Sequence, residues 1–587
     1  MFFEKNISAL RTVNPELAEA IINHNKEVSA EVVRTKTGMP SVKVGNISLH
    51  SLYDPIREAR DWVRHHEKEI EGAESICVLG FGLGYHVLEL FKNTEAKIIV
   101  FEPGLDILKT ALGLFCLTSI LSEIKIVTDG RVPSFNNTAI LEHKPSVNLS
   151  RGYFEHLLAR LRARERIHQG LKILVVGPLY GGSLPIARYC SSALKKLGHE
   201  VEFFDSSRFS DSMSFAKEIT KDKAWYNRLI DMLTTFLSEA VLAKCETFKP
   251  DLVFALAQAP LTSECLGRLR AHKVPTAFWF VEDFRLMNYW RKLSVAYDYF
   301  FTIQQGDFFE ELKNEGTGNY CYLPTAACPD EHKEMELTDN EKDYYGSDIS
   351  FAGAGYYNRR HFFRGLLDLD FKIWGDGWPR DPAYAKYIQR SGGRIETEEM
   401  VKVFNASEIN INLHSSTYHK GVNPFGDFVN PRTFEIAACG AFQLVDRRSG
   451  LEGLFDAGEE IIVFDDLDDL RHKISYYIEH PEERKRTAEK ARQRVRKEHT
   501  YEHRMRRMLE FIADCGYEPP VRNAEGERIQ DLIGEAGDDS ELVEYLSGFD
   551  GRERVTLPDI IRKIENGEGA ISRTETIFLM MNELIKK

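Results

Sequence analysis

Apolar residues along the chain gather in short uninterrupted runs, each followed by a turn and then by a stretch with helical spacing. The first clear case starts with Ile76 to Leu79 and continues through a glycine cluster, the helical pattern YHVLELFKN and a second apolar run, KIIVFEP. Short runs of this kind are typical of strands that are buried on both faces. Since a strand, a helix and a strand in succession form a parallel pair, we expect an α/β protein built on parallel sheets.

The same order of elements recurs twice further along the chain. A second unit starts at LKILVVGPLYGG and continues through EVEFFD, PDLVFALAQ, VPTAFWFVED and YDYFFTIQ. A third starts at DISFAGAGYYNRR and continues through FKIWGDGW, EININLHSS, GAFQLVD and EIIVF. The segment between them, CPDEHKEMELTDNEKDYYGSD, is charged and poor in apolar residues, as linkers are. The sequence therefore predicts three Rossmann-like units in one chain.

These patterns divide the chain into five parts. Helical patterns surround the strand-like SVKVGNISLHS at the start, and NNTAILEHKPSVNLSRG, from about residue 136 to 151, predicts a hinge before an Arg-rich helix. The run after Pro481 is rich in Lys, Arg and Glu and has helical spacing. We predict a lead-in subdomain at 1–70, Rossmann-like domains at 71–169, 170–325 and 326–513, and a helical appendix at 514–587.

Composition limits the function. The chain has 587 residues, with 76 Lys and Arg against 90 Asp and Glu, so a net charge of −14 offers no general attraction to nucleic acid or anionic lipid. No apolar stretch approaches the ~18 residues of a membrane span and no leader pattern is present, so we expect a cytoplasmic protein without stable membrane insertion. The nine cysteines include no CxxC pair, and no H-E-x-x-H motif occurs, so no metal site is predicted.

The segment FVNPRTFEIAACGAFQLVD carries the strongest chemical signal. Asn430 is a good N-cap and Pro431 a good first helical residue, so a helix should begin here and end at Gly440. Its start attracts phosphate, and Arg432 adds a cation where a diphosphate would lie. Glu435 is acidic on an otherwise apolar helix, so it either accepts from both hydroxyls of a ribose or is an ordinary glutamate favoured by the helix dipole.

This segment and the sequence after it, as far as VRKEHTYEHR, closely resemble the C-terminal domain of CgeB-like glycosyltransferases, whose hallmark is an R-x-F-E-x-x-A-C-G helix. These in turn resemble the nucleotide-sugar-dependent enzymes of the GT-B fold, in which two Rossmann-like domains face a cleft. The resemblance covers Leu171 to about Arg504. It implies an acceptor-side domain at 170–325, a donor domain at 326–513, a UDP-sugar or other NDP-sugar donor and no metal. It also implies that Glu435 binds the donor's ribose.

The resemblance has one departure and suggests further donor contacts. Related retaining enzymes carry E-x7-E, but this chain has Asp427 eight residues before Glu435, which either replaces that glutamate or is a loop aspartate. The stereochemical course therefore stays open. FAGAGYYNRR resembles the first turn of the donor domain, where glycines let the backbone approach a ligand and Arg359 or Arg360 either meets phosphate or lies on the surface. The expected donor contacts are Gly353, Gly355, Arg359, Arg360, Gly375, Trp378, His414, Ser415, Pro431, Arg432, Thr433 and Glu435.

His414 and Ser415 follow a strand, and ligands collect at such strand ends, although an interior histidine is the alternative for His414. In the second unit, Gly181 and Gly182 end the first strand without a lysine in P-loop spacing, and in the GT-B fold this loop faces the cleft. FWFVEDFR places Glu282 and Asp283 directly after an apolar strand. Either acid is a candidate base for an inverting transfer, and an N-cap aspartate is the alternative.

The first unit carries GFGLGYH after a strand and Glu102 at the end of the next strand. Gly80, Gly82, Gly84 and Glu102 have the layout of an S-adenosylmethionine or dinucleotide site. LHSLYDPIREA and CVLGFGLGYHVLELF resemble the N-terminal region of Maf-like flagellin glycosylation proteins, which implies a methyltransferase-like domain that accompanies sugar transfer.

The resemblances predict a glycosyltransferase whose acceptor is a protein such as flagellin or a cell-surface glycan. The rivals are a bifunctional enzyme with methyl transfer and an inactive nucleotide-sugar-binding protein. Because no methylation motif accompanies the glycine turn, S-adenosylmethionine is not expected as a cofactor.

Overall fold

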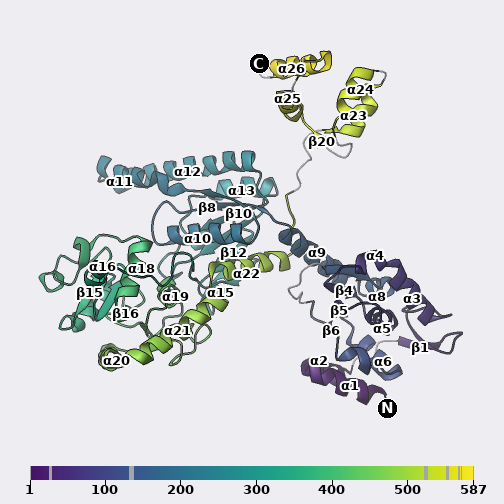
Figure 1. Cartoon of the computed structure of the whole chain (residues 1–587), viewed down its shortest axis with the longest axis horizontal. Coiled ribbons are helices and arrows are strands. Elements are labelled where there is room, and N and C mark those ends of the chain that lie inside the picture. The colour runs from purple at the N-terminus through teal and green to yellow at the C-terminus, as the bar shows by residue number, and fades with distance from the viewer. Residues whose placement is uncertain are drawn as a thin grey trace. The chain divides into compact units, whose positions relative to one another are not determined.

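The computed structural model describes residues 2–25, 30–130, 138–520, 527–537, 539–549, 554–565, 567, 569 and 571–585. Figure 1 labels its helices and strands along the chain. The chain packs into two compact units. The larger consists of Met1–Arg270 and Pro275–Glu518, and the smaller of Ala271–Val274 and Pro519–Lys587.

The N-terminal part begins with two helices and a small antiparallel sheet of order β1-β2-β3. Asn14 caps the second helix, because its side chain accepts a hydrogen bond from the N–H of Leu17 at 3.0 Å. The elements are α1 (Phe2–Val13), α2 (Pro15–Asn23), β1 (Ala30–Arg34), β2 (Pro40–Val44), β3 (Ile47–Ser48), α3 (Pro55–His65) and α4 (Glu67–Ile70). The predicted mixture of helices around a strand-like piece is therefore present.

The first parallel sheet has the order β6-β5-β4-β7, which in chain order is the 3-2-1-4 of a Rossmann fold. The strand order reverses between β4 and β7, so the topological switch point lies there. The strands are β4 (Ser75–Leu79), β5 (Lys97–Phe101), β6 (Lys125–Val127) and β7 (Thr138–Glu142). The helices are α5 (Tyr85–Phe91), α6 (Leu105–Leu114), α7 (Thr118–Leu121), α8 (Lys144–Leu149) and α9 (Arg151–His168).

The predicted hinge at 136–151 is wrong for the part that the structure describes. Residues 136 and 137 lie outside the described residues, and the rest forms strand β7 and helix α8. Strand β7 is an edge strand with mostly half-buried side chains. Because an edge strand needs fewer apolar residues than a central one, its pattern is weak in the sequence.

The second parallel sheet has the order β13-β12-β11-β10-β8-β9. Its order reverses between β8 and β10, so the carboxyl ends of these two strands mark the second switch point. The strands are β8 (Lys172–Val176), β9 (Glu200–Phe204), β10 (Leu252–Leu256), β11 (Thr276–Phe280), β12 (Tyr299–Thr302) and β13 (Tyr320–Tyr322). The helices are α10 (Ser183–Lys196), α11 (Ser210–Ile219), α12 (Lys223–Phe248), α13 (Ser263–Ala271), α14 (Trp290–Leu293) and α15 (Asp307–Asn314).

The third parallel sheet has the order β15-β14-β16-β17-β18, and its switch point lies between β14 and β16. The strands are β14 (Ile349–Ala352), β15 (Phe371–Trp374), β16 (Ile409–Asn412), β17 (Gln443–Asp446) and β18 (Ile462–Phe464). The helices are α16 (Asp339–Tyr345), α17 (Tyr357–Phe362), α18 (Thr397–Ala406), α19 (Pro431–Ala438), α20 (Leu467–Glu479), α21 (Pro481–Glu498) and α22 (Tyr501–Asp514).

The charged segment before β14 is more ordered than its linker-like composition predicts. It contains α16, whose start is a capping box between Thr338 and Glu341. It also contains His332, which is only 1% exposed. A charged composition therefore did not reveal that one of its side chains is buried.

Helix α22 packs against the second sheet although it follows the third in sequence. Tyr501, Met505 and Met508 share a core with the residues of β8, β10 and β11. Beside the helix start, Ala327 donates to His499 O at 3.0 Å and accepts from the N–H of Tyr501 at 3.1 Å. The chain thus leaves the second unit, builds the third and returns by one helix. Two doubly wound sheets in this arrangement confirm the predicted GT-B fold.

The C-terminal unit is small and mainly helical in its described part, as the sequence predicts. Its core contains Ile529, Leu546, Val555, Ile560 and Ile561. The elements are β19 (Glu527–Arg528), α23 (Ile529–Ala536), α24 (Ser540–Ser547), β20 (Arg554–Val555), α25 (Leu557–Glu565) and α26 (Arg573–Ile585). Across the described residues of the whole chain, no helix combines the length and the apolar character of a membrane span.

Candidate active site

Helix α19 begins as the sequence predicts. Asn430 is its N-cap, and the side-chain oxygen accepts from the N–H of Thr433 at 3.2 Å. The amide of Asn430 donates to Asn412 at the end of β16, and the amide of Asn412 donates to the hydroxyl of Thr433. The helix ends at Ala438, and Gly440 then takes a left-handed φ of 68°. Side-chain hydrogen bonds therefore fix the helix start against the third sheet.

His414 supports the same helix start from inside the protein. Its Nε2 accepts from the N–H of Asn430 at 2.9 Å, and its Nδ1 lies 2.6 Å from Asp446. Burial lowers the pKa of His414 to about 4 although Asp446 opposes this, so the ring is neutral at pH 7. Burial also opposes the ionisation of Asp446, but Arg448 and His414 outweigh it and lower the pKa of this carboxyl. Both ring nitrogens of His414 thus have protein partners, as expected for an interior histidine. Ser415 beside it is half-buried.

Glu435 lies one turn into α19 and is only 4% exposed. Its carboxylate accepts a hydrogen bond from Arg432, the predicted phosphate-binding arginine. Burial, followed by the charge of Glu435, raises the pKa of Tyr189 and of Tyr501. Tyr189 lies on α10 and Tyr501 on α22, and both helices pack against the second sheet, so Glu435 lies close to the place where the two GT-B halves meet.

His332 is a neighbour of Glu435 that the sequence did not single out. Its Nδ1 accepts from the N–H of Cys328 at 3.0 Å, which leaves the ring proton on Nε2. Nε2 lies 3.8 Å from Glu435 Oε1, too far for a hydrogen bond, and has no other hydrogen-bond partner among the described residues. A buried N–H donor therefore points toward the predicted ribose-binding carboxylate.

The glycines at the start of the third sheet pack against one another. A Cβ atom on Gly355 would lie 2.8 Å from Gly377 O, and one on Gly375 would lie 2.6 Å from Gly353 O. The indole of Trp378 donates to Gly353 O at 3.1 Å. The absence of side chains here is thus required by the contact between the loops after β14 and β15.

The two neighbouring arginines also bond to backbone carbonyls. Arg359 is 8% exposed and donates to Leu413 O and Ala354 O, and burial lowers its pKa to about 10. Arg360 is exposed and donates to Gly355 O and Gly377 O. Since Arg432 also reaches the carbonyl of Ala352 at 3.2 Å, all three arginines brace the loops at the switch point. Of the three, only Arg432 also contacts Glu435.

The two adjacent acids after β11 lie in different surroundings. The Glu282 carboxylate accepts from the amide of Gln258 and the hydroxyl of Tyr289, and burial raises its pKa despite these bonds. Asp283 Oδ1 accepts from the N–H of Arg285 at 3.0 Å and so caps a turn. It is not the N-cap aspartate named as the alternative, because the next helix, α14, has Tyr289 as its N-cap. Gly181, after β8, has a φ of 99°, and its carbonyl accepts from Arg394 at 3.2 Å.

Asp427 links the third unit to the second. One carboxylate oxygen accepts from Arg285 at 2.9 Å, and the other accepts from the amide of Gln304 at 2.8 Å. The same amide lies 3.3 Å from Asp283 Oδ1. The fold therefore brings two of the three predicted catalytic acids, Asp283 and Asp427, to one amide group, while Glu282 bonds elsewhere. Gln304 follows β12 at a strand end, the one signal that would have indicated it.

In the glycine turn of the first sheet, other residues of the protein occupy the space that a ligand would need. Glu102 accepts from the N–H groups of Phe81 at 2.9 Å and Gly104 at 3.0 Å, and burial raises its pKa to about 7. A Cβ atom on Gly80 would lie 2.2 Å from the side chain of Ser146. Gly84, with a φ of 85°, is the N-cap of α5. The residues expected to hold a nucleoside thus make internal contacts.

Two doubly wound parallel sheets and a helix that returns from the third unit to the second give this chain the GT-B fold, with a buried acid on the helix between β16 and β17. Residues 359–510 match the family described as glycosyl transferase-like, and residues 48–138 match the glycosyltransferase Maf N-terminal domain. Spore protein CgeB of Bacillus subtilis (strain 168) is 28% identical over 260 residues, covering 42% of this chain and 78% of CgeB. The chain is therefore similar to CgeB-like glycosyltransferases, and its N-terminal part is similar to the Maf N-terminal domain.

Solved structures with similar folds include other glycosyltransferases. A glycosyltransferase from Rickettsia africae ESF-5 has a TM-score of 0.41 at 15% identity and covers 59% of this chain and 99% of its own. HepE from Anabaena in complex with UDP-glucose has a TM-score of 0.40 at 12% identity and covers 58% and 99%. Sucrose-phosphate synthase from Thermosynechococcus elongatus has a TM-score of 0.40 at 11% identity and covers 57% and 97%. Since these scores are low, the fold assignment rests on the strand orders above.

Proposed function

We propose that this enzyme takes its sugar from a nucleotide-sugar, a UDP-sugar or another NDP-sugar, and that Glu435 binds the ribose of the donor. The observation that carries the proposal is the position of Glu435. It is a buried carboxylate on the helix that follows β16, in a family match that includes this helix. Arg432 occupies part of its hydrogen-bonding capacity, and a carboxylate can accept further hydrogen bonds from two vicinal hydroxyls.

The donor's diphosphate would lie at the start of α19. Pro431 has no N–H, and Asn430 already takes the N–H of Thr433, so the helix start offers fewer donors than the sequence suggested. Arg432 therefore supplies most of the positive charge in this proposal. Its guanidinium would turn from Glu435 toward the phosphates and stabilise the leaving nucleotide as the glycosidic bond breaks, without a metal.

The acceptor would approach from the second unit. If the transfer inverts configuration, a carboxylate must take the acceptor's proton, and we favour Glu282 for this role because burial raises its pKa. Asp283 is engaged in capping a turn. A protein such as flagellin, or a cell-surface glycan, is the class of acceptor that we propose.

A binding screen tests the proposal. The purified chain is incubated with a panel of nucleotide-sugars, and the melting temperature and the release of nucleoside diphosphate are measured. Because a ligand that binds only the folded state raises the apparent stability, at least one nucleotide-sugar should raise the melting temperature, and Glu435→Gln should reduce that rise. Glu459→Gln, at an exposed ion pair with Lys490, is the matched control. A screen in which no nucleotide-sugar binds would exclude the proposal.

A further inference from the structure

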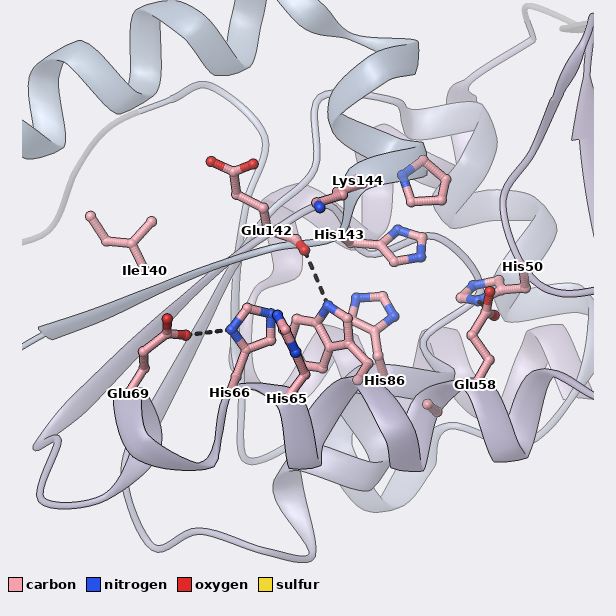
Figure 2. Close-up of a pocket in the computed structure, with 13 residues that line it drawn as sticks. His50, Glu58, His65, His66, Glu69, His86, Ile140, Glu142, His143 and Lys144 are labelled. Atoms are coloured by element: carbon pink, nitrogen blue, oxygen red, sulfur yellow. Dashed lines mark hydrogen bonds and ion pairs between the residues drawn. The ribbon is translucent and has the colours of Figure 1, made fainter.

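A cavity of ≈ 600 Å³ lies beside the switch point of the first sheet, outside the proposed donor site. It is lined by side chains from α3, α4, α5, β7, α8 and the loops after β3 and β7 (Figure 2). Three acids and several apolar residues contribute, but the main feature is the number of imidazoles. The histidines that line it are His50, His65, His66, His86 and His143.

Three of these histidines form a buried cluster. His50, His86 and His143 are 3%, 2% and 5% exposed. Each offers one ring nitrogen, and these nitrogens all lie within 4.8 Å of one another. The rings of His86 and His143 stack in parallel with their centroids 4.1 Å apart, and His50 lies beside the pair (Figure 2). The fold thus brings together three imidazoles that are far apart in the sequence.

The hydrogen bonds of His86 leave one lone pair without a partner. Its Nε2 lies 3.0 Å from Gly80 O, and because a carbonyl only accepts, this nitrogen carries the ring proton. Nδ1 therefore has a lone pair, and within the described part of the chain it has no hydrogen-bond partner. A buried acceptor of this kind needs a partner, and a neutral imidazole nitrogen is a common metal ligand.

His50 has its proton on the side away from the cluster. Its Nε2 accepts from the N–H of Leu83 at 3.0 Å, so the proton lies on Nδ1, 3.4 Å from the carboxylate of Glu58. Metal-binding histidines usually donate their second N–H to a carboxylate or a carbonyl. Glu58 plays that part for His50, and Gly80 O plays it for His86.

Burial opposes the protonation of two histidines of the cluster, His86 and His143. Burial, helped by the charge of His50, lowers the pKa of His86 to about 3. Burial also lowers the pKa of His143 well below its usual value, with His86 and His50 adding to the effect. Burial therefore favours the unprotonated, metal-binding form of His86 and His143.

We propose that His50, His86 and His143 bind a transition-metal ion that prefers imidazole ligands, such as Zn²⁺. Three histidine ligands leave a coordination position for water or for a small ligand in the adjoining cavity. Because the rings of His86 and His143 lie in nearly parallel planes, their lone pairs cannot both point at one ion, so one ring must rotate on binding. Both rings line the cavity. His50 must also exchange its hydrogen bond with Leu83 for the metal.

The test is a Zn²⁺ titration of the full chain, first stripped with a chelator, in competition with a chromophoric chelator. One equivalent should bind to the unmutated chain. His86→Gln and His143→Gln should each weaken binding by more than the ~10 to 100-fold that follows loss of an outer partner of a metal ligand. His156→Gln, on the exposed face of α9, and a His65→Gln/His66→Gln variant at the rim should bind as the unmutated chain does.

A Co²⁺ titration of the unmutated chain keeps the proposal testable if a histidine variant fails to fold. Binding by this site should produce visible absorption bands of low-symmetry, nitrogen-coordinated Co²⁺, which excess Zn²⁺ removes. The proposal is overturned if the unmutated chain shows no saturable binding of either ion. It is also overturned if Zn²⁺ binds equally to the His86→Gln/His143→Gln double variant, or if only the rim variant loses the ion.

Discussion

Replacement of Glu435 by glutamine removes one charge from the centre of the proposed donor site and keeps the volume of the side chain. The carboxylate is 4% exposed, so hydrogen bonds to it are shielded from water. Charge-assisted hydrogen bonds of this kind contribute about 1.5 to 3 kcal/mol. At 1.4 kcal/mol per factor of ten, Glu435→Gln should weaken binding of the nucleotide-sugar by about 10 to 150-fold.

The alternative role of Glu435 predicts a different result. If it serves only as the i,i+3 partner of Arg432, its loss costs about 0.2 to 0.5 kcal/mol of stability and leaves donor affinity unchanged. Glu489→Gln is a matched control, because Glu489 forms an i,i+3 pair with Arg492 on α21. Calorimetric titration of both variants with the preferred donor and its 2′-deoxy analogue separates the roles. Unchanged affinity in Glu435→Gln would refute the assignment.

Three further predictions concern other parts of the chain. His414 has a pKa of about 4 in the folded protein against a usual 6.5, so the folded state favours its neutral form. This contributes up to about 3 kcal/mol to the free energy of unfolding above pH 6.5, and the contribution is lost as the pH falls through 4. The pH dependence of urea unfolding should be shallower in His414→Gln, and an unaltered slope contradicts this. Gly80→Ala should lower the free energy of unfolding by about 2 to 4 kcal/mol, because φ is 101° and the new Cβ would lie 2.2 Å from a serine side chain. Gly113→Ala, with open space around it, is the control and should leave the thermal melt unchanged. If Asp427 acts through Arg285, then Asp427→Asn and Arg285→Gln should lower the same kinetic parameter of the transfer, and the double variant should lose no more activity than either single variant. Additive losses would show that Asp427 acts independently.

The fold was predictable because the central strands are buried on both faces. Every residue of β4, β10 and β11 is buried, so each strand appears in the sequence as a continuous apolar run. Strand β7 escaped notice because it lies at a sheet edge. The return of α22 to the second unit was not visible either, since its apolar spacing shows that one face is buried but not against which sheet.

In the candidate site, the features that depend on neighbouring residues were predictable, and those that depend on tertiary contacts were not. The start of α19 follows from Asn430 and Pro431, whose preferences act over a few residues. His332 and Arg285 could not be selected, because each obtains its role from a partner in a distant part of the chain. A lone histidine in a charged segment carries no sequence signal for the buried carboxylate that it approaches.

Glycine-rich turns follow the first strand of all three sheets, and the same sequence signal has three different structural causes. In the first sheet, a Cβ on Gly82 would lie 2.8 Å from His50, so the space belongs to the histidine cluster. In the third, a Cβ on Gly355 would collide with the loop after β15.

The turn after β8 differs from both. A Cβ on Gly181 would meet only Gln258, at 3.4 Å, and one on Gly182 would meet nothing within 4 Å among the described residues. Glycine permits a ligand to approach the backbone only where no other part of the protein fills the space. By this criterion Gly181 and Gly182 are the positions in this turn whose backbone a ligand can reach directly. The donor would instead be recognised by side chains, chiefly Glu435 and Arg432.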